Sequence, residues 1–383
     1  MSRRVVAIGL MAAVLTVLAG SAQVNGFVAT HATAERQVRE LLELREHAVR
    51  SADADAWRQT IDGPAVASQV ALFEALDRLE LDAWSERLTA LESGPDGSWR
   101  ASVRVRYRFP GEQTDAVVDA VLDVTTQSRI AGWAPAAPSV WDIHGVRIQT
   151  GQHSLVVGGE GVPLRAYAAE LDRASVSVGQ FLNEPPPRLV LVLPQNWDQA
   201  VGMLPTRLGA GWAAVTSVLG PPGTSEGPVR ILADPAVLAR LDDPTRSVVF
   251  GHEAFHVATP ARVSTPRWLA EGLADHAGYR GSDIALDRAL SGLLRHARAA
   301  GVPETLPPDA SFADPRRATW AYEGAHLAVR LLVAEHGAAA VMAFYEAVAD
   351  GTAIDTAMRE ILGTDVPSLT AGWRDEVITR AAR

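Results

Sequence analysis

Two histidines and a glutamate near the middle of the chain have the spacing that metal-dependent chemistry requires. The segment HEAFH contains His252, Glu253 and His256. On a helix, positions i and i+4 lie on one face, so both imidazoles can bind the same ion. Neutral imidazoles suit zinc, and Glu253 can reach a water bound to that ion. Two surface histidines can produce the same pattern by chance. The surrounding sequence must therefore distinguish a zinc site from a chance match.

A second segment, TPRWLAEGLADHAG, contains the carboxylates that such a site needs. A catalytic zinc takes three protein ligands and keeps one open position. Glu271 follows His256 by 15 residues, on a helix that a short loop can fold back antiparallel. Asp275, four residues after Glu271, can accept the free ring N–H of a ligand histidine. Gly272 would let two helices approach closely, and Gly278 is expected to end the helix.

Together, HEAFH and TPRWLAEGLAD resemble the gluzincins, specifically the peptidase-MA-like group, over residues 145–383. The resemblance implies that His252, His256 and Glu271 bind one zinc ion. It also implies that Glu253 is the general base and that Asp275 is the outer partner of His252. The activity implied is hydrolysis of peptide bonds by a zinc-activated water. The interval between His256 and Glu271 is shorter than in the best-known aminopeptidase and thermolysin branches, so the branch stays open.

Related enzymes place a Tyr or His on a later helix, where it stabilises the developing oxyanion. Tyr322 and His326 share a helical face and are the candidates here.

Thermolysin-like peptidases also pair an edge strand with an extended peptide substrate. By resemblance, the candidate strand is Gly211–Val215, beginning with Gly211, Trp212 and Ala213. An ordinary core strand is the alternative interpretation of this segment.

The elements that must position these residues indicate an α+β chain. Helices are expected at residues 34–51, 54–61, 65–79, 164–182, 283–300, 319–336 and 338–350, and strands at 99–109, 116–126, 130–133, 139–143, 188–193 and 228–233. Helices followed by antiparallel strands resemble an NTF2-like α+β cone over residues 34–143. Residues 144–383 are expected to form a zincin-like metallopeptidase domain with a mixed sheet and a mostly helical C-terminal half.

Residues 1–33 contain an apolar run that follows two arginines and ends in small residues, which is typical of a signal peptide. Residues 5–24 approach the ~20 apolar residues that span a bilayer, so an N-terminal membrane anchor is the alternative. Either interpretation predicts an extracytoplasmic protein, secreted or anchored to the membrane. The net charge of −10 gives no general attraction to nucleic acid, and the absence of cysteine excludes disulfides and thiolate zinc sites.

The sequence therefore predicts an exported zinc metallopeptidase that acts on a peptide or protein. One alternative is a catalytically silent protein of zincin fold, an extracytoplasmic binding or assembly module. Another is that the N-terminal domain binds a small ligand or an envelope component. The sequence does not distinguish endopeptidase from aminopeptidase action, and it does not indicate the substrate, the oligomeric state or whether the leader is cleaved.

Overall fold

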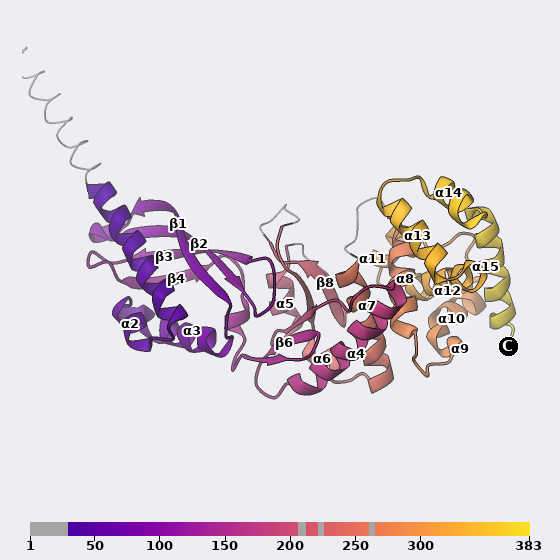
Figure 1. Ribbon diagram of the computed structural model, residues 1–383, viewed down its shortest axis with the longest axis horizontal. Coiled ribbons are helices and arrows are strands. Elements are labelled where there is room, and N and C mark those ends of the chain that lie inside the picture. The colour runs from indigo at the N-terminus through magenta and orange to yellow at the C-terminus, as the bar shows by residue number, and fades with distance from the viewer. Residues whose placement is uncertain (1–29, 206–211, 221–225, 260–264) are drawn as a thin grey trace, which may run out of the picture. The chain divides into compact units, whose positions relative to one another are not determined.

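The computed structural model describes residues 30–205, 212–220, 226–259 and 265–383 (Figure 1). The chain divides into two compact units with a boundary between Asp142 and Ile143, and the segment Gly220–Pro228 groups with the first unit. The sequence interpretation places the boundary after residue 143. The predicted anchor at residues 5–24 lies outside the described residues. Among the helices in the described ranges, none is long and apolar enough to cross a membrane.

The first unit is built from helices followed by an antiparallel sheet. After a helix at residues 30–50 come α2 (Ala54–Gln59), α3 (Val66–Arg78), β1 (Ala83–Ser93), β2 (Trp99–Arg108), β3 (Ala116–Val124) and β4 (Ile130–Pro135). The strands pair in the order β1-β2-β3-β4. The half-buried strand predicted at 99–109 is confirmed, and Arg104 on its open face pairs with Asp119 at 2.8 Å. The resemblance to NTF2-like domains stays a prediction.

Two strand expectations in this unit need correction. The segment predicted as a strand at 139–143 contains a short 3₁₀ turn, Val140–Asp142, because the Asp142 carboxylate accepts the Ser139 N–H at 2.8 Å and closes the backbone on itself. β1 is absent from the sequence prediction. Its second half is mostly exposed and polar, so it lacks the alternating pattern that identifies β2.

The second unit begins with a mixed sheet, as predicted. β5 (Arg147–Thr150), β6 (Ser154–Gly158), β7 (Leu189–Leu193), β8 (Ala214–Val218) and β9 (Val229–Ala233) pair in the order β5-β6-β7-β9-β8. β6, β7 and β9 are parallel, and β6 and β7 are buried along their whole length, which explains their continuous apolar sequences. α4 (Leu164–Leu182) connects β6 to β7 at the predicted bounds.

β8 lies at the edge of this sheet but begins later than expected. It starts at Ala214, so Trp212 and Ala213 precede the strand, and Gly211 lies outside the described residues. The carbonyl of Ala213 accepts the N–H of Asp234 at 3.1 Å. The predicted strand Gly211–Val215 is therefore shifted by three residues, because its pairing with β9 covers Ala214–Val218.

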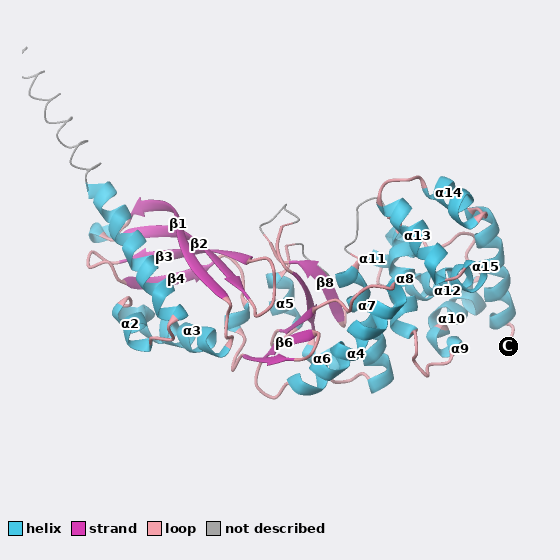
Figure 2. Cartoon of the chain, viewed as in Figure 1, coloured by secondary structure: helices cyan, strands magenta, loops and turns pink. Residues whose placement is uncertain are grey.

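In the described part of the chain, all elements after β9 are helical (Figure 2). α5 (Trp197–Met203) lies before β8, and after β9 come α6 (Pro235–Leu238), α7 (Asp243–Ala258), α8 (Arg267–Tyr279), α9 (Leu286–Ala289), α10 (Ser291–Ala300), α11 (Asp309–Ala313), α12 (Ala318–His336), α13 (Ala338–Ala349), α14 (Ile354–Ala357) and α15 (Val366–Ala381). A π-helical turn at Met358–Leu362 follows α14. The prediction of a mostly helical C-terminal half is confirmed.

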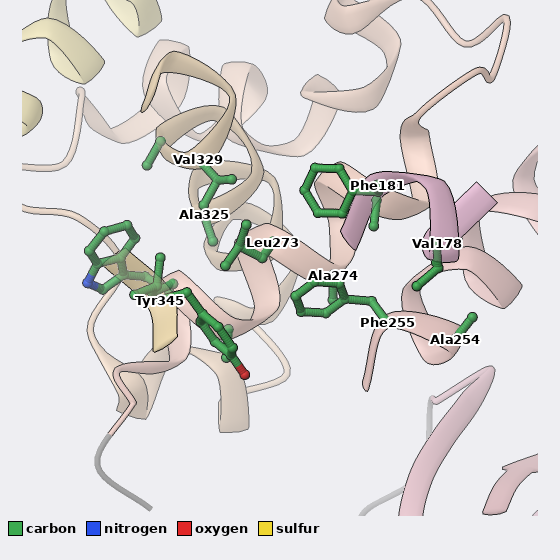
Figure 3. Packing of buried hydrophobic residues seen from close by; sticks show 14 of the residues in the cluster. Val178, Phe181, Ala254, Phe255, Leu273, Ala274, Ala325, Val329 and Tyr345 are labelled. Atoms are coloured by element: carbon green, nitrogen blue, oxygen red, sulfur yellow. The ribbon is translucent and has the colours of Figure 1, made fainter. Parts of the chain in front are cut away.

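One buried apolar cluster joins α4 to most of these helices. Figure 3 shows residues from α4, α7, α8, α12 and α13 meeting in it: Val178, Phe181, Ala254, Phe255, Leu273, Ala274, Ala325, Val329 and Tyr345. Burial of apolar surface stabilises a fold by roughly 25 cal/mol per Å². Because α7 and α8 also carry the candidate site residues, this cluster fixes the position of the site.

Candidate metal centre

α7 presents its two histidines one turn apart on a single face. Asp242 caps the helix by accepting the N–H of Thr245 at 2.9 Å. Phe255 is fully buried, whereas the side chains of His252 and His256 are 14% and 18% exposed. The four-residue spacing brings the Nε2 atoms of the two rings to 3.1 Å from each other. Both imidazoles therefore point to one position.

α8 packs against α7 through a pair of glycines. A Cβ atom on Gly251 would lie 2.7 Å from the Cα of Gly278, and a Cβ on Gly278 would lie 2.5 Å from the Val248 carbonyl oxygen. From the sequence, Gly278 is expected to end α8. In the structure α8 includes Gly278 and ends one residue later, at Tyr279. Gly272 faces α12, where a Cβ would lie 2.5 Å from the Ala325 oxygen. The close approach of the metal-site helices comes from Gly251 and Gly278.

Glu271 completes a cluster of three ligand atoms. Its Oε2 lies 3.3 Å from Nε2 of His256 and 3.4 Å from Nε2 of His252. Two ligands of a tetrahedral zinc with bonds of about 2.0–2.1 Å lie about 3.3–3.4 Å from each other. The three observed separations of 3.1, 3.3 and 3.4 Å match this edge length. Two imidazoles and a carboxylate are also a donor set that catalytic zinc sites use, so the residues fit the ion.

Two further side chains hold these ligands in position. Oδ1 of Asp275 lies 2.7 Å from Nδ1 of His252, so the Nδ1–H donates to the carboxylate and Nε2 is the ring nitrogen that faces the other two ligand residues. Arg267 donates to the second carboxylate oxygen of Glu271 at 3.1 Å. This arrangement leaves Oε2 of Glu271 directed at the histidines.

The electrostatics of the cluster favour positive charge. Burial opposes a charged imidazole, but the carboxylates of Asp275 and Glu271 outweigh it and raise the pKa of His252 well above its usual range. Burial likewise opposes a charged Glu271, but the two histidines lower the pKa of that carboxyl well below its usual range. A site in which buried carboxylates surround imidazoles in this way is suited to a cation.

Glu253 lies on the same helix and contacts the edge strand. It is buried, and its Oε2 accepts the hydroxyl of Thr216 on β8 at 2.6 Å. The Thr216 hydroxyl is also 3.3 Å from the backbone oxygen of Glu253. A residue of the edge strand thus orients the carboxylate predicted to be the general base.

The structure separates Tyr322 from His326. The ring of Tyr322 lies 6.1 Å from the rings of both His252 and Trp212. Burial first, and then the negative charge of Glu271, raise the pKa of the Tyr322 phenol, which keeps it protonated. His326 lies one turn further along α12. The centre of its ring is 4.6 Å from the ring centre of Tyr279 and 6.2 Å from that of His276.

In the part of the chain that it describes, the structure thus gives no contact that supports His326 as an oxyanion donor. Among the described residues, no hydrogen bond or ring contact joins His326 to the three ligand residues. One helical turn advances the chain by about 5.4 Å, and this displacement brings His326 to the C-terminal end of α8.

Sequence reasoning missed Thr216 and Arg267. Arg267 precedes Glu271 by four residues, so the pairing rule for charges on one helix face could have identified it. Thr216 interrupts the apolar sequence of β8, but its partner lies 37 residues away. That contact depends on the tertiary fold and has no local signal.

Comparison with known proteins gives no family assignment. No family model and no curated protein matches the chain. Among solved structures, the M1 zinc metallopeptidase from Deinococcus radiodurans aligns with 76% of this chain and 61% of its own length, at 16% identity and a TM-score of 0.40. A two-domain M1 zinc metallopeptidase variant bound to L-tryptophan aligns with 76% of this chain and 60% of its own, at 14% identity and a TM-score of 0.38.

The chain thus spans less than two thirds of the length of these structures.

Proposed function

We propose that this protein is a zinc-dependent peptidase that hydrolyses peptide bonds, with His252, His256 and Glu271 as the ligands of one zinc ion. The observation that carries the proposal is the convergence of three ligand atoms at 3.1–3.4 Å, beside the buried carboxylate of Glu253. Asp275 fixes the tautomer of His252, and Arg267 orients Glu271. These two contacts leave Nε2 of His252 and Oε2 of Glu271 facing the position of the ion.

A zinc ion held by these three residues would act as a Lewis acid and lower the pKa of a water to about 7. Glu253 accepts a proton from the water that attacks the peptide carbonyl and passes it to the amine nitrogen as the C–N bond breaks, and Thr216 holds the carboxylate for this step. The protonated phenol of Tyr322 donates to the carbonyl oxygen as negative charge develops there.

β8 supports the assignment of a peptide as the substrate. In the described part of the sheet it has a neighbour on one side only, β9. A free edge can add an extended peptide as a further strand, through backbone hydrogen bonds that do not depend on sequence. Trp212 precedes this strand and contacts Tyr322, so a peptide on the edge would pass the proposed oxyanion donor.

The proposed location of the enzyme is extracytoplasmic. Its support is the order of arginines, apolar run and small residues in the first part of the sequence.

Replacing the general base tests the proposal directly. Glu253→Gln keeps the size of the side chain but cannot accept the proton, so cleavage of a denatured protein should fall by roughly 10²–10⁴-fold. The ligands are unchanged, and zinc content should stay near one equivalent. Peptide products are measured by mass spectrometry and zinc by atomic emission.

Glu304→Gln is the matched control, because this exposed glutamate lies outside the site, and it should leave both readouts unchanged. Equal cleavage by the wild type and Glu253→Gln would refute the peptidase proposal. Zinc binding with no cleavage by either protein would favour the catalytically silent alternative.

A further inference from the structure

A separate cavity lies where the C-terminal end of α8 meets α12. Its volume is about 360 Å³. Six polar residues line it, from α8, from the loop after α8 and from α12: His276, Tyr279, Arg280, Ser282, His326 and Arg330. None of them is a proposed zinc ligand or a partner of one. The proposed peptidase chemistry therefore leaves this group of residues unused.

The charged side chains that line the cavity are Arg280 and Arg330, while the carboxylates of Asp275 and Glu323 act on Tyr279 from outside the lining. No carboxylate lines the cavity, although the whole chain has a net charge of −10. The exposed guanidinium groups of Arg280 and Arg330 form no ion pair with the described residues, and Arg280 contacts the face of Phe181. Burial first, and then the charges of His326, Arg330 and Arg280, lower the pKa of His276 to about 4. The lining of the cavity thus contains two guanidinium groups and no carboxylate.

Two of the lining residues also carry buried polar atoms without partners. Within the described ranges, neither Nδ1 of His326 nor the hydroxyl oxygen of Ser282 has a hydrogen-bond partner. His326 is only 3% exposed. A buried polar group that lacks a partner destabilises the folded state, and native proteins keep few of them. A ligand that bonds to these residues would remove that penalty.

We propose that this cavity binds the phosphate group of a small molecule. Two guanidinium groups, two imidazoles and two hydroxyls approach from three parts of the chain. A lining with several separate donors suits a tetrahedral oxyanion, whereas a planar carboxylate is satisfied by one guanidinium fork. A cavity of about 360 Å³ has the volume of roughly ten waters, more than a phosphate alone occupies. The ligand class is therefore a phosphate monoester.

Titration calorimetry of the purified protein with inorganic phosphate and with glycerol phosphate tests this site. Both should bind saturably, and glycerol phosphate should bind more tightly. Arg280→Gln and Arg330→Gln should each weaken binding roughly tenfold, because each removes a charge-assisted hydrogen bond. Both side chains are exposed, so both variants should fold. Arg316→Gln, which removes an exposed arginine outside the cavity, should bind as the wild type does.

Imidazole ¹⁵N signals provide a second readout. Bound phosphate should raise the pKa of His276 from about 4 towards its ordinary value, and the two arginine substitutions together should abolish the shift. Absence of saturable binding would overturn the proposal. Equal affinity in all three arginine variants would also overturn it, because phosphate would then bind elsewhere, for example at the metal centre. Tighter binding of citrate than of either phosphate ligand would refute the assignment of a phosphate group.

Discussion

At the scale of single residues, Glu253 is held by a hydrogen bond from outside its own helix. The hydroxyl of Thr216 donates to its carboxylate at 2.6 Å. Thr216→Val keeps the shape of the side chain but removes this donor. A hydrogen bond to a charged group contributes about 1.5–3 kcal/mol, so kcat/KM for a peptide substrate should fall roughly tenfold or more. Zinc content and thermal midpoint, measured on the same samples, should stay close to those of the wild type.

Thr216→Ser is the matched control, because serine keeps the hydroxyl, and it should retain most of the activity. If Thr216→Val cleaves as fast as the wild type, the hydroxyl does not orient the base. If its zinc content falls together with its activity, the hydroxyl acts on the fold of the site instead.

The residues of the site differ in how far the sequence predicts them. His252 and His256 share a face because of helical spacing alone, and Asp275 follows Glu271 by the same rule. His326 shows the limit of helical spacing as a guide. The four-residue interval places Tyr322 and His326 on one face of α12, but it does not indicate which residues of other helices each of them contacts. Tyr322 meets His252, while His326 meets Tyr279. The difference depends on where α12 crosses α8.

At the scale of helices, the geometry of the metal centre depends on how closely α7 approaches α8. A Cβ on Gly251 would lie 2.7 Å from the Cα of Gly278, and this backbone atom can move only if its helix moves. Gly251→Ala should therefore separate the helices and move His252 away from Asp275. We expect a loss of about 1–3 kcal/mol in the free energy of unfolding and weaker zinc binding, measured by denaturant titration and by chelator competition.

Gly372→Ala is the matched control on another helix. Gly372 lies within α15, and no atom beyond the adjacent residues and the backbone of its own helix lies within 4 Å of a Cβ built there. The substitution should stabilise the protein by roughly 0.4–1 kcal/mol, because alanine loses less conformational entropy on folding. A Gly251→Ala variant that also gains stability and binds zinc normally would show that the close contact is not needed.

Elements were predictable where burial follows a regular pattern. α4 was predicted at its observed bounds because its apolar residues recur with helical period over 19 residues. The strand predicted at Gly211–Val215 begins three residues before the observed β8. The bounds of β8 are set by its pairing with β9, and its sequence does not alternate clearly. The contact between Gly251 and Gly278 has no sequence pattern, since each glycine could equally have ended a helix or formed a turn.

At the scale of the whole molecule, each of the two units has buried features of its own. In the first unit, Arg45 is fully buried and donates to both carboxylate oxygens of Glu86, at 2.9 and 3.2 Å. Its guanidinium also lies 3.7 Å from the centre of the Trp57 ring. The second unit contains the large apolar cluster and the metal centre. Because each unit is compact and has its own core, we expect each to unfold in its own transition.

Calorimetry with one perturbation in each unit tests this expectation. Glu86→Gln leaves the charge of Arg45 buried without a carboxylate, a loss of about 3–5 kcal/mol that should lower the midpoint of one transition by more than about 10 °C. Removing zinc with a chelator should lower only the other, because saturation at a hundredfold excess over Kd stabilises by about 2.7 kcal/mol. Glu74→Gln, which breaks an exposed pair with Arg78, should change neither midpoint measurably. A single transition, or a chelator effect on the transition that Glu86→Gln lowers, would contradict independent unfolding, since a ligand stabilises only the cooperative unit that binds it.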